Sequence, residues 1–183
     1  MEPVPEAMTS AIIKIVIWVI PVIILVKITE KTELFSYLGL RHSIRKGLKW
    51  AGGVSILFIL YFLVLNIAFL EGAELQIGFN EWLNTIILVG ITEEIVFRGF
   101  LLRKLLNSYR FWIANIITSI LFVSIHFPIW FHKGLFEFPY ILSATITAFI
   151  LSMIFGFVYR KSNSLWSVII LHSFYNLLVS LFY

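Results

Sequence analysis

Six long apolar segments dominate this chain and leave few folds open to it. Each holds about 20 mostly apolar residues, the length that an α-helix needs to cross ~30 Å of hydrocarbon. They cover residues 10–28, 48–70, 82–102, 111–131, 138–159 and 165–183. Backbone within lipid has to satisfy its own hydrogen bonds, which favours helices over isolated strands. We therefore expect an all-α, polytopic membrane protein built as a bundle of about six transmembrane helices.

The composition excludes most other classes of protein. Apolar residues make up 60% of the 183 residues and charged residues 13%, with a mean hydropathy of +0.97. A soluble domain is about 45–50% apolar and about 25% charged, so a soluble enzyme or a disordered chain is not expected. The absence of Cys and Asp rules out disulfides, thiolate metal sites, a cysteine nucleophile and a pair of catalytic aspartates. The length fits a single membrane domain over residues 1–183, and no nucleic-acid motif is present.

Basic residues alternate between the predicted loops. The loops at 27–49, 103–110 and 160–164 hold six, three and two Lys or Arg residues. The loop at 71–81 holds none, and the loop at 132–137 holds one. Loops rich in Lys and Arg stay on the cytoplasmic side of a membrane. We therefore expect a multi-pass protein of the cell membrane, embedded in the lipid bilayer, with both termini outside.

The last four predicted membrane segments carry five ionisable side chains. They are Glu93, Glu94, Arg98, His126 and His172. Each costs ~2.5–3.5 kcal/mol on insertion, so such a group normally marks a functional site. The first two segments carry Lys14 alone in their interior, near enough to an end to snorkel toward the interface. We expect an active-site cavity within the membrane, between the last four helices.

Spacing within the third segment predicts one ion pair. Glu94 and Arg98 are four residues apart, so they lie on one face of a helix and neutralise each other. Glu93 is rotated by about 100° from that face and has no partner in its own helix. We expect Arg98 to be structural and Glu93 to be available for chemistry. A structural ion pair with a spare carboxylate is the alternative interpretation, and it does not explain the second glutamate.

Polar and small residues form stripes on the last three segments. Polar stripes consist of Asn115, Ser119, Phe122 and His126 in the fourth and of His172, Asn176 and Ser180 in the sixth, while the fifth carries the small residues Ala144, Ala148, Ser152 and Gly156. We interpret the small residues as a face for close helix packing. On straight, upright helices His126 and His172 would differ by ~12 Å in depth, so tilt or a break has to bring them together. We expect Pro128 to end the fourth helix just after His126.

These side chains suit hydrolysis of an amide inside the membrane. A carboxylate in an apolar site can act as a general base, so Glu93 together with His126 can hold and deprotonate a water. His172 and Asn176 lie on one helix face and can donate hydrogen bonds to an oxyanion. Two His and one Glu are also a catalytic ligand set for zinc. No cofactor is required, but Glu93, His126 and His172 leave a zinc site open.

Three motifs in order carry a resemblance to a known family. They are Glu93-Glu94-x-x-x-Arg98, Phe122-x-x-x-His126 and His172-x-x-x-Asn176. This series resembles the CAAX prenyl protease and bacteriocin-processing family, also called the abortive-infection family, which includes the type II CAAX prenyl endopeptidases. The resemblance covers residues 80–180, which we take as the catalytic core.

The resemblance implies an intramembrane peptidase that acts on a membrane-embedded or lipidated peptide. It implies that Glu93 and His126 activate water and that His172 and Asn176 support the oxyanion. Supporting roles fall to the remaining motif residues, Glu94, Arg98 and Phe122. Both a metal-dependent and a metal-free mechanism have been argued for the family, and the resemblance leaves both open.

Two other functions share these sequence features. A non-enzymatic bacteriocin immunity or membrane scaffold protein would bind a peptide in the same cavity without cleaving it. A proton-coupled transporter also uses Glu and His inside the membrane, although this chain has no visible inverted repeat. The substrate, the cleavage site and the oligomeric state stay open at the level of sequence.

Overall fold

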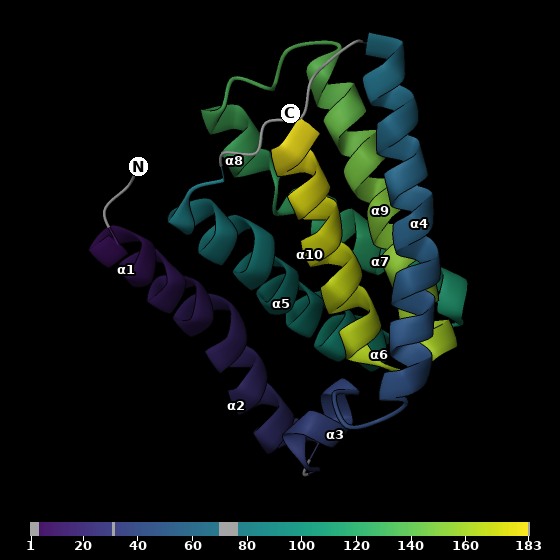
Figure 1. Ribbon diagram of the computed structural model, residues 1–183. Helices are drawn as coiled ribbons and strands as arrows, with labels where there is room; N and C mark the ends of the chain where they lie inside the picture. The colour runs from purple at the N-terminus through teal and green to yellow at the C-terminus, as the bar shows by residue number, and fades with distance from the viewer. Residues whose placement is uncertain (1–3, 31, 70–76, 183) are drawn as a thin grey trace.

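The computed structural model describes residues 4–30, 32–69 and 77–182, and the regular structure in them is helical (Figure 1). The first half holds α1 (Val4–Lys14), η1 (Ile15–Val19), α2 (Ile20–Thr29), α3 (Leu34–Leu38) and α4 (Ile44–Phe69). The second half holds η2 (Glu81–Ile87), α5 (Leu88–Glu94), η3 (Ile95–Leu102), α6 (Arg103–Leu105), α7 (Phe111–Ser124), α8 (Phe127–His132), α9 (Tyr140–Ser162) and α10 (Leu165–Phe182). The elements labelled η have the wider turns of a π-helix.

Five of the described helices are long and apolar enough to cross a membrane. They are Val4–Thr29, Ile44–Ile67, Phe111–His132, Tyr140–Ser162 and Leu165–Phe182. The remaining predicted segment, 82–102, also folds as a helix within the helical run 81–105, but its charged residues set it apart from these five. The chain is therefore a polytopic helical membrane protein, and the predicted all-α fold class is confirmed.

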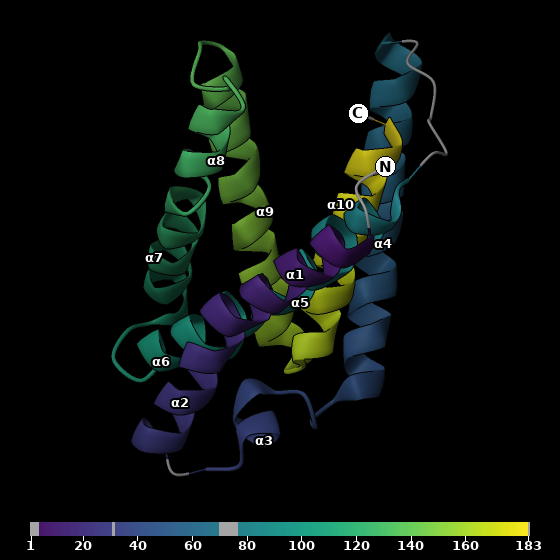
Figure 2. The same cartoon turned by 90° about the vertical axis from the view of Figure 1, so that its left-hand side faces the viewer.

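Seen from the side, the helices form a V. Figure 2 shows α7, α8 and α9 on one side and α4 and α10 on the other, while α1, α2 and α5 cross the lower part obliquely. The α1–α2 helix and α5 lie side by side in each view, and η2 and α5 contact α1. This arrangement leaves the upper part of the V open between α9 and α10.

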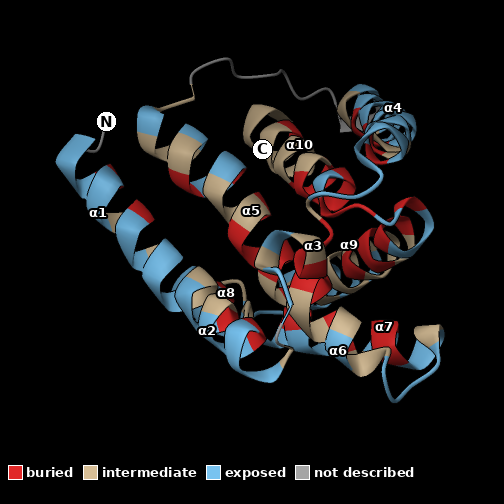
Figure 3. Ribbon diagram, turned by 90° about the horizontal axis from the view of Figure 1, so that it is seen from below, coloured by how far each residue is buried: buried red, intermediate tan, exposed pale blue. Residues whose placement is uncertain are grey.

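The apolar core lies where α10 packs against α4, α5 and α9. Phe58, Phe155 and Leu171 are among its buried residues. Figure 3 shows buried residues gathered on α5, α9 and α10, and exposed residues along α1 and α4. Many of the exposed residues are apolar, such as Ile17 at 61% and Ile67 at 73% exposure. An apolar outer surface is what a lipid-facing helix needs, so contact with lipid accounts for the exposed apolar residues of α1 and α4.

A short connection fixes the lower end of α10. Gly39 ends α3 with φ of 81°, a left-handed conformation that glycine adopts without strain. Its carbonyl accepts a hydrogen bond from the backbone N–H of Leu165, and Trp166 Nε1 donates to the carbonyl of Leu40 at 3.0 Å. The loop that follows α2 therefore sets the position at which α10 begins.

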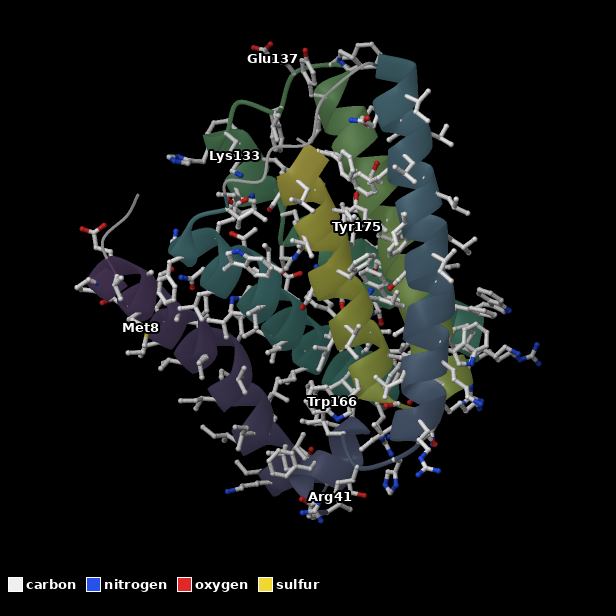
Figure 4. The ribbon with its side chains drawn as sticks, viewed as in Figure 1. Met8, Arg41, Lys133, Glu137, Trp166 and Tyr175 are labelled. Atoms are coloured by element: carbon white, nitrogen blue, oxygen red, sulfur yellow. The ribbon has the colours of Figure 1, made fainter. Side chains whose placement is uncertain are left out.

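Charged side chains mark the two ends of the bundle. Figure 4 places Arg41 at the end that holds α3 and places Lys133 and Glu137 at the opposite end. The basic loops that follow α2, η3 and α9 share the end of Arg41. This placement agrees with the alternation of basic loops, although it does not assign either end to the cytoplasm. Residues 71–76 of the predicted acidic loop lie outside the described residues.

Candidate active site

Both glutamates of the first motif lie at the last turn of α5, where the helix changes to the wider η3. Glu94 and Arg98 are fully buried, and Glu93 is 9% exposed. A wide turn of this kind is rare and frequently occurs at functional sites, because it changes the direction in which neighbouring side chains point. Among the described residues, Oε2 of Glu93 has no hydrogen-bond partner. Glu93 is thus a buried carboxylate that its own helix does not neutralise.

Both terminal nitrogens of Arg98 donate hydrogen bonds. Its Nη1 donates to Glu94 Oε1 at 2.7 Å, which confirms the predicted ion pair. Its Nη2 donates to both the carbonyl and the hydroxyl of Ser152 on α9, at 2.9 and 2.7 Å. The guanidinium lies 5.0 Å from the ring of Phe122 and 5.4 Å from the ring of Phe155, within the range of a cation–π contact. Arg98 therefore joins α9 and α7 to the helix that carries the glutamates.

His172 bridges the two glutamates. Its Nδ1 donates to Glu94 Oε1 at 2.8 Å, and its Nε2 lies 3.9 Å from Glu93 Oε2. A carboxylate on Nδ1 fixes which ring nitrogen carries the proton. In the neutral ring Nε2 is therefore an acceptor, and it donates only when the ring is protonated. The donor role expected of His172 at an oxyanion requires that protonated form.

His126 lies in a break of its helix. α7 ends at Ser124, and α8 begins at Phe127 with Pro128 in its first turn, where the fixed φ of proline favours helix initiation. The prediction that Pro128 ends the helix just after His126 is therefore wrong, because the helix already ends at Ser124 and Pro128 lies in the first turn of the next one. His126 Nδ1 donates to the carbonyl of Phe122 at 2.7 Å, which leaves Nε2 as the acceptor of the neutral ring.

Phe122 resolves the expected difference in depth between the two histidines. Its ring centroid lies 4.8 Å from that of His126 and 6.0 Å from that of His172. The break between α7 and α8 replaces the straight, continuous helix on which the ~12 Å estimate rested. Both histidine rings therefore pack against Phe122, which brings His172 of the third motif close to His126 of the second.

Asn176 lies one turn beyond His172 on α10. Its Nδ2 donates to the carbonyl of Thr85 in η2 at 2.9 Å. An amide nitrogen carries two hydrogens, so one hydrogen remains for another acceptor. The bond to Thr85 fixes the plane of the amide and hence the direction of that second hydrogen.

Three of the four predicted catalytic residues line one cavity of about 430 Å³. They are His126, His172 and Asn176, and the cavity lies between the two arms of the V in Figure 2. Glu93 is not part of the lining and meets the site through His172. The structure therefore brings three of the four residues to one cavity, and Glu93, which was expected there as well, lies outside its lining.

The small-residue stripe of α9 serves two purposes. Gly156 packs so closely against Asn115 of α7 that a Cβ atom would collide with its side chain, as expected of a packing face. Higher on α9, Ala144 and Ala148 line the cavity instead. Small side chains at these two positions leave room in the cavity that larger ones would fill.

Comparison with protein families identifies the chain. Residues 75–178, more than half of its length, match the family of type II CAAX prenyl endopeptidase Rce1-like proteins. The chain belongs to this Rce1-like family. Comparisons with curated proteins and with solved structures gave no match. The family assignment confirms the resemblance inferred from the three motifs, and the matched range contains every predicted site residue.

A metal site was tested on this Rce1-like chain. Among the described residues, no three His or Glu side chains gather in a geometry that could hold a metal ion. The set considered from sequence, Glu93, His126 and His172, therefore does not form a ligand cage in this arrangement. The reaction proposed below uses no metal.

Two contacts of the site had no clear signal in the sequence. Ser152 is the one hydroxyl residue of the small-residue stripe on α9, and its hydroxyl accepts a hydrogen bond from Arg98. Thr85 contributes its backbone carbonyl, so no side-chain pattern could have identified it. Members of this Rce1-like site thus include groups that only the fold brings together.

Proposed function

We propose that this chain is an intramembrane endopeptidase that hydrolyses a peptide bond of a membrane-embedded or lipidated peptide. Family membership supports the reaction class. The observation that carries the proposal for these residues is the hydrogen bonding of the histidines. Each uses Nδ1 inside the protein, which leaves Nε2 for the reaction. The carboxylate of Glu93 lies beside the second of these rings.

Glu93 is the general base in this proposal. Its carboxylate takes a proton from a water whose other contact is Nε2 of His126, and the water oxygen attacks the carbonyl carbon of the substrate. A carbon–oxygen bond forms while the carbonyl π electrons move to oxygen. The protonated Glu93 then gives its proton to the leaving nitrogen as the carbon–nitrogen bond breaks. One water is consumed, and a carboxylate and an amine are released.

Asn176 stabilises the negative oxygen of the tetrahedral intermediate. The second hydrogen of its amide is the donor, and its direction is set by the bond to Thr85. His172 adds a second donor at Nε2 when its ring is protonated, since Nδ1 is already bound to Glu94. Arg98 and Glu94 act by holding His172, so they support the reaction without touching the substrate.

The cavity fits an apolar substrate segment. Its volume of about 430 Å³ lies within the ~300–1,000 Å³ of ordinary ligand pockets. Most of its other lining residues are apolar or aromatic, and they include Trp130, Tyr140, Leu151 and Val179. A lipidated or transmembrane peptide can bury apolar groups there while its scissile bond approaches His172 and Asn176.

The test is cleavage of a defined peptide by the purified protein in detergent. The probe is a farnesylated, fluorescence-quenched peptide that ends in a CAAX sequence, and mass spectrometry locates the cut. Glu93→Gln removes the base with little change in shape, so we expect no turnover and an unchanged melting temperature. Asn176→Ala removes one oxyanion donor and should lower the rate by about 10²–10³-fold. Glu137→Gln, on an exposed loop, is the matched control.

Other outcomes separate the alternatives. Full activity of Glu93→Gln would contradict the proposal. Binding of the peptide by the wild-type protein without cleavage would favour an immunity or scaffold function. Because no step here uses a metal, we expect turnover to be unchanged by a chelator.

A further inference from the structure

Lys14 is a charged residue that the proposed reaction leaves unused. It is the only charged residue between Glu6 and Lys27, in the middle of the first apolar helix. Its side chain does not snorkel to an interface as expected. Instead it is half-buried, and its Nζ donates to the backbone carbonyl of Asn84 at 2.7 Å. The one charged side chain in the interior of the first helix therefore points toward η2 and not toward a membrane interface.

The contact is part of a close packing between α1 and η2. Ala7, Ala11 and Lys14 share one face of α1, because they are spaced four and three residues apart. Both alanines are buried, and their small side chains let the two backbones approach. In return, Asn84 Nδ2 donates to the carbonyl of Ala7 at 2.8 Å. Asn84 is therefore bound to α1 through its side chain at one point and through its carbonyl at another.

The next carbonyl in η2 is bound from the opposite side of the site. Thr85 accepts a hydrogen bond from Asn176 of α10, while Asn84 accepts from Lys14 of α1. Successive residues of a helix point in different directions, so η2 lies between these two side chains. One peptide unit thus separates the ammonium group from the carbonyl that orients the Asn176 amide.

We propose that Lys14 is a positioning residue that acts on Asn176 through the backbone of η2. The ammonium group fixes the carbonyl of Asn84 and with it the direction of the Thr85 carbonyl. That carbonyl holds the amide of Asn176 with its second hydrogen toward the cavity. The inference rests on the proposed function, because it assigns Lys14 a part in the same reaction.

Two observations favour this role over a simple tie between helices. A tie needs no charge, since Asn84 already binds Ala7, and a charged side chain at this depth is costly where an apolar one is not. The carbonyl that Lys14 binds is also followed in the chain by the one that holds Asn176, whereas the bond to Ala7 involves only the side chain of Asn84. Lys14 lies outside the matched range 75–178, and the site therefore extends beyond the part that defines the family.

The test compares Lys14→Met with Lys27→Met in detergent. Both variants replace a lysine of the first apolar helix by an apolar side chain of similar length, but Lys27 is exposed. With the farnesylated CAAX peptide we expect Lys14→Met to lower kcat by about 10-fold at an unchanged KM, because it weakens an interaction made in the transition state. Lys27→Met should leave kcat and KM unchanged. If Lys14→Met folds poorly, Lys14→Gln replaces it, since it removes the charge but keeps a donor.

A second variant separates positioning from a loss of stability. In an Asn176→Ala background, Lys14→Met should lower kcat by less than two-fold, because the group through which Lys14 acts is already gone. A structural tie would instead lower the melting temperature and leave kcat per folded molecule unchanged in both backgrounds. A further 10-fold loss in the Asn176→Ala background would overturn the proposal.

A readout without substrate distinguishes this inference from the proposed function. In protein labelled with ¹⁵N-asparagine, the side-chain amide signals of Asn176 are assigned by their loss in Asn176→Ala. Lys14→Met should shift these signals, and Lys27→Met should not. Unshifted signals would overturn the positioning role even if the peptide is cleaved. Shifted signals in a protein that cleaves no peptide would keep the positioning of Asn176 and reject the peptidase function.

Discussion

At the scale of single residues, one oxygen of Glu94 holds two partners. Oε1 accepts from Arg98 Nη1 at 2.7 Å and from His172 Nδ1 at 2.8 Å. All three side chains are almost fully buried, so each would be a costly group in an apolar interior if it lost its partner. The ion pair and the orientation of the histidine are therefore a single arrangement.

We predict that Arg98→Ala lowers the free energy of unfolding by about 3–5 kcal/mol, because it leaves the Glu94 carboxylate buried without its cation. Thermal unfolding in detergent and the yield of folded protein would measure the loss. Arg160→Ala, at an exposed position of α9, should show little change. The double variant Glu94→Leu with Arg98→Met should be less destabilised than the sum of its single changes, since it removes both charges together. Additive losses would show that the two side chains are held elsewhere.

Local contacts of the site could be predicted from sequence, and distant ones could not. Glu94 and Arg98 are four residues apart, so helix geometry alone brings them together. The contact between Glu94 and His172 spans 78 residues and depends on how α10 packs against α5. Lys14 was expected to snorkel because nothing in its own helix reveals a partner carbonyl 70 residues away.

At the scale of elements, α5 and α10 meet at a glycine. A Cβ atom on Gly90 would lie 3.0 Å from the backbone nitrogen of Ser173 and 3.3 Å from the carbonyl of Ile169, and would collide with the Ser173 hydroxyl. This contact is about one turn from Glu93 on one helix and adjacent to His172 on the other. The distance between α5 and α10 therefore sets the distance between the carboxylates and the histidine.

We predict that Gly90→Ala destabilises the protein by about 1–3 kcal/mol, the usual cost of overpacking. It should also lower the rate of peptide cleavage per folded molecule, because the two helices have to separate. Gly53→Ala in α4 is the matched control, since a Cβ atom there meets nothing within 4 Å. Thermal unfolding and single-turnover kinetics together measure both effects. An unchanged melting temperature in Gly90→Ala would mean that the helices are not in tight contact.

Hydropathy predicted the helices but not the changes of pitch within them. Long apolar runs need no tertiary contact to be recognised, so the approximate extents of the segments followed from the sequence. The wide turns of η2 occur where Lys14 of α1 and Asn176 of α10 bond to its backbone carbonyls. Those bonds depend on packing, which a single sequence does not display.

At the scale of the whole molecule, the helical run 81–105 determines whether the two termini lie on the same side of the membrane. Five apolar helices would put the two termini on opposite sides, whereas a sixth crossing by the helical run 81–105 puts them on the same side. Its buried Glu94 and Arg98 neutralise each other and also bond to α10 and α9, so these charges do not prevent the helix from lying among the apolar ones.

We predict that reporter fusions at the loops 27–49 and 71–81 report opposite sides, with the first in the cytoplasm and both termini outside. The basic residues of the first loop give the physical reason. Fusions at the two termini provide an internal check, because they should agree with each other. Two loop fusions that both report the cytoplasm would contradict this topology.

The interruption between α7 and α8 also bears on how water would reach the site in the proposed reaction. Pro128 has no N–H, so the carbonyl of Ser124 lacks the donor that a continuous helix would supply. Inside a bilayer such backbone is tolerated only against protein or where it borders a hydrated space. His126, two residues after Ser124, lines the cavity. The proposed reaction consumes one water for every bond that is cut, and a backbone carbonyl without a helix donor close to His126 would offer that water a polar contact.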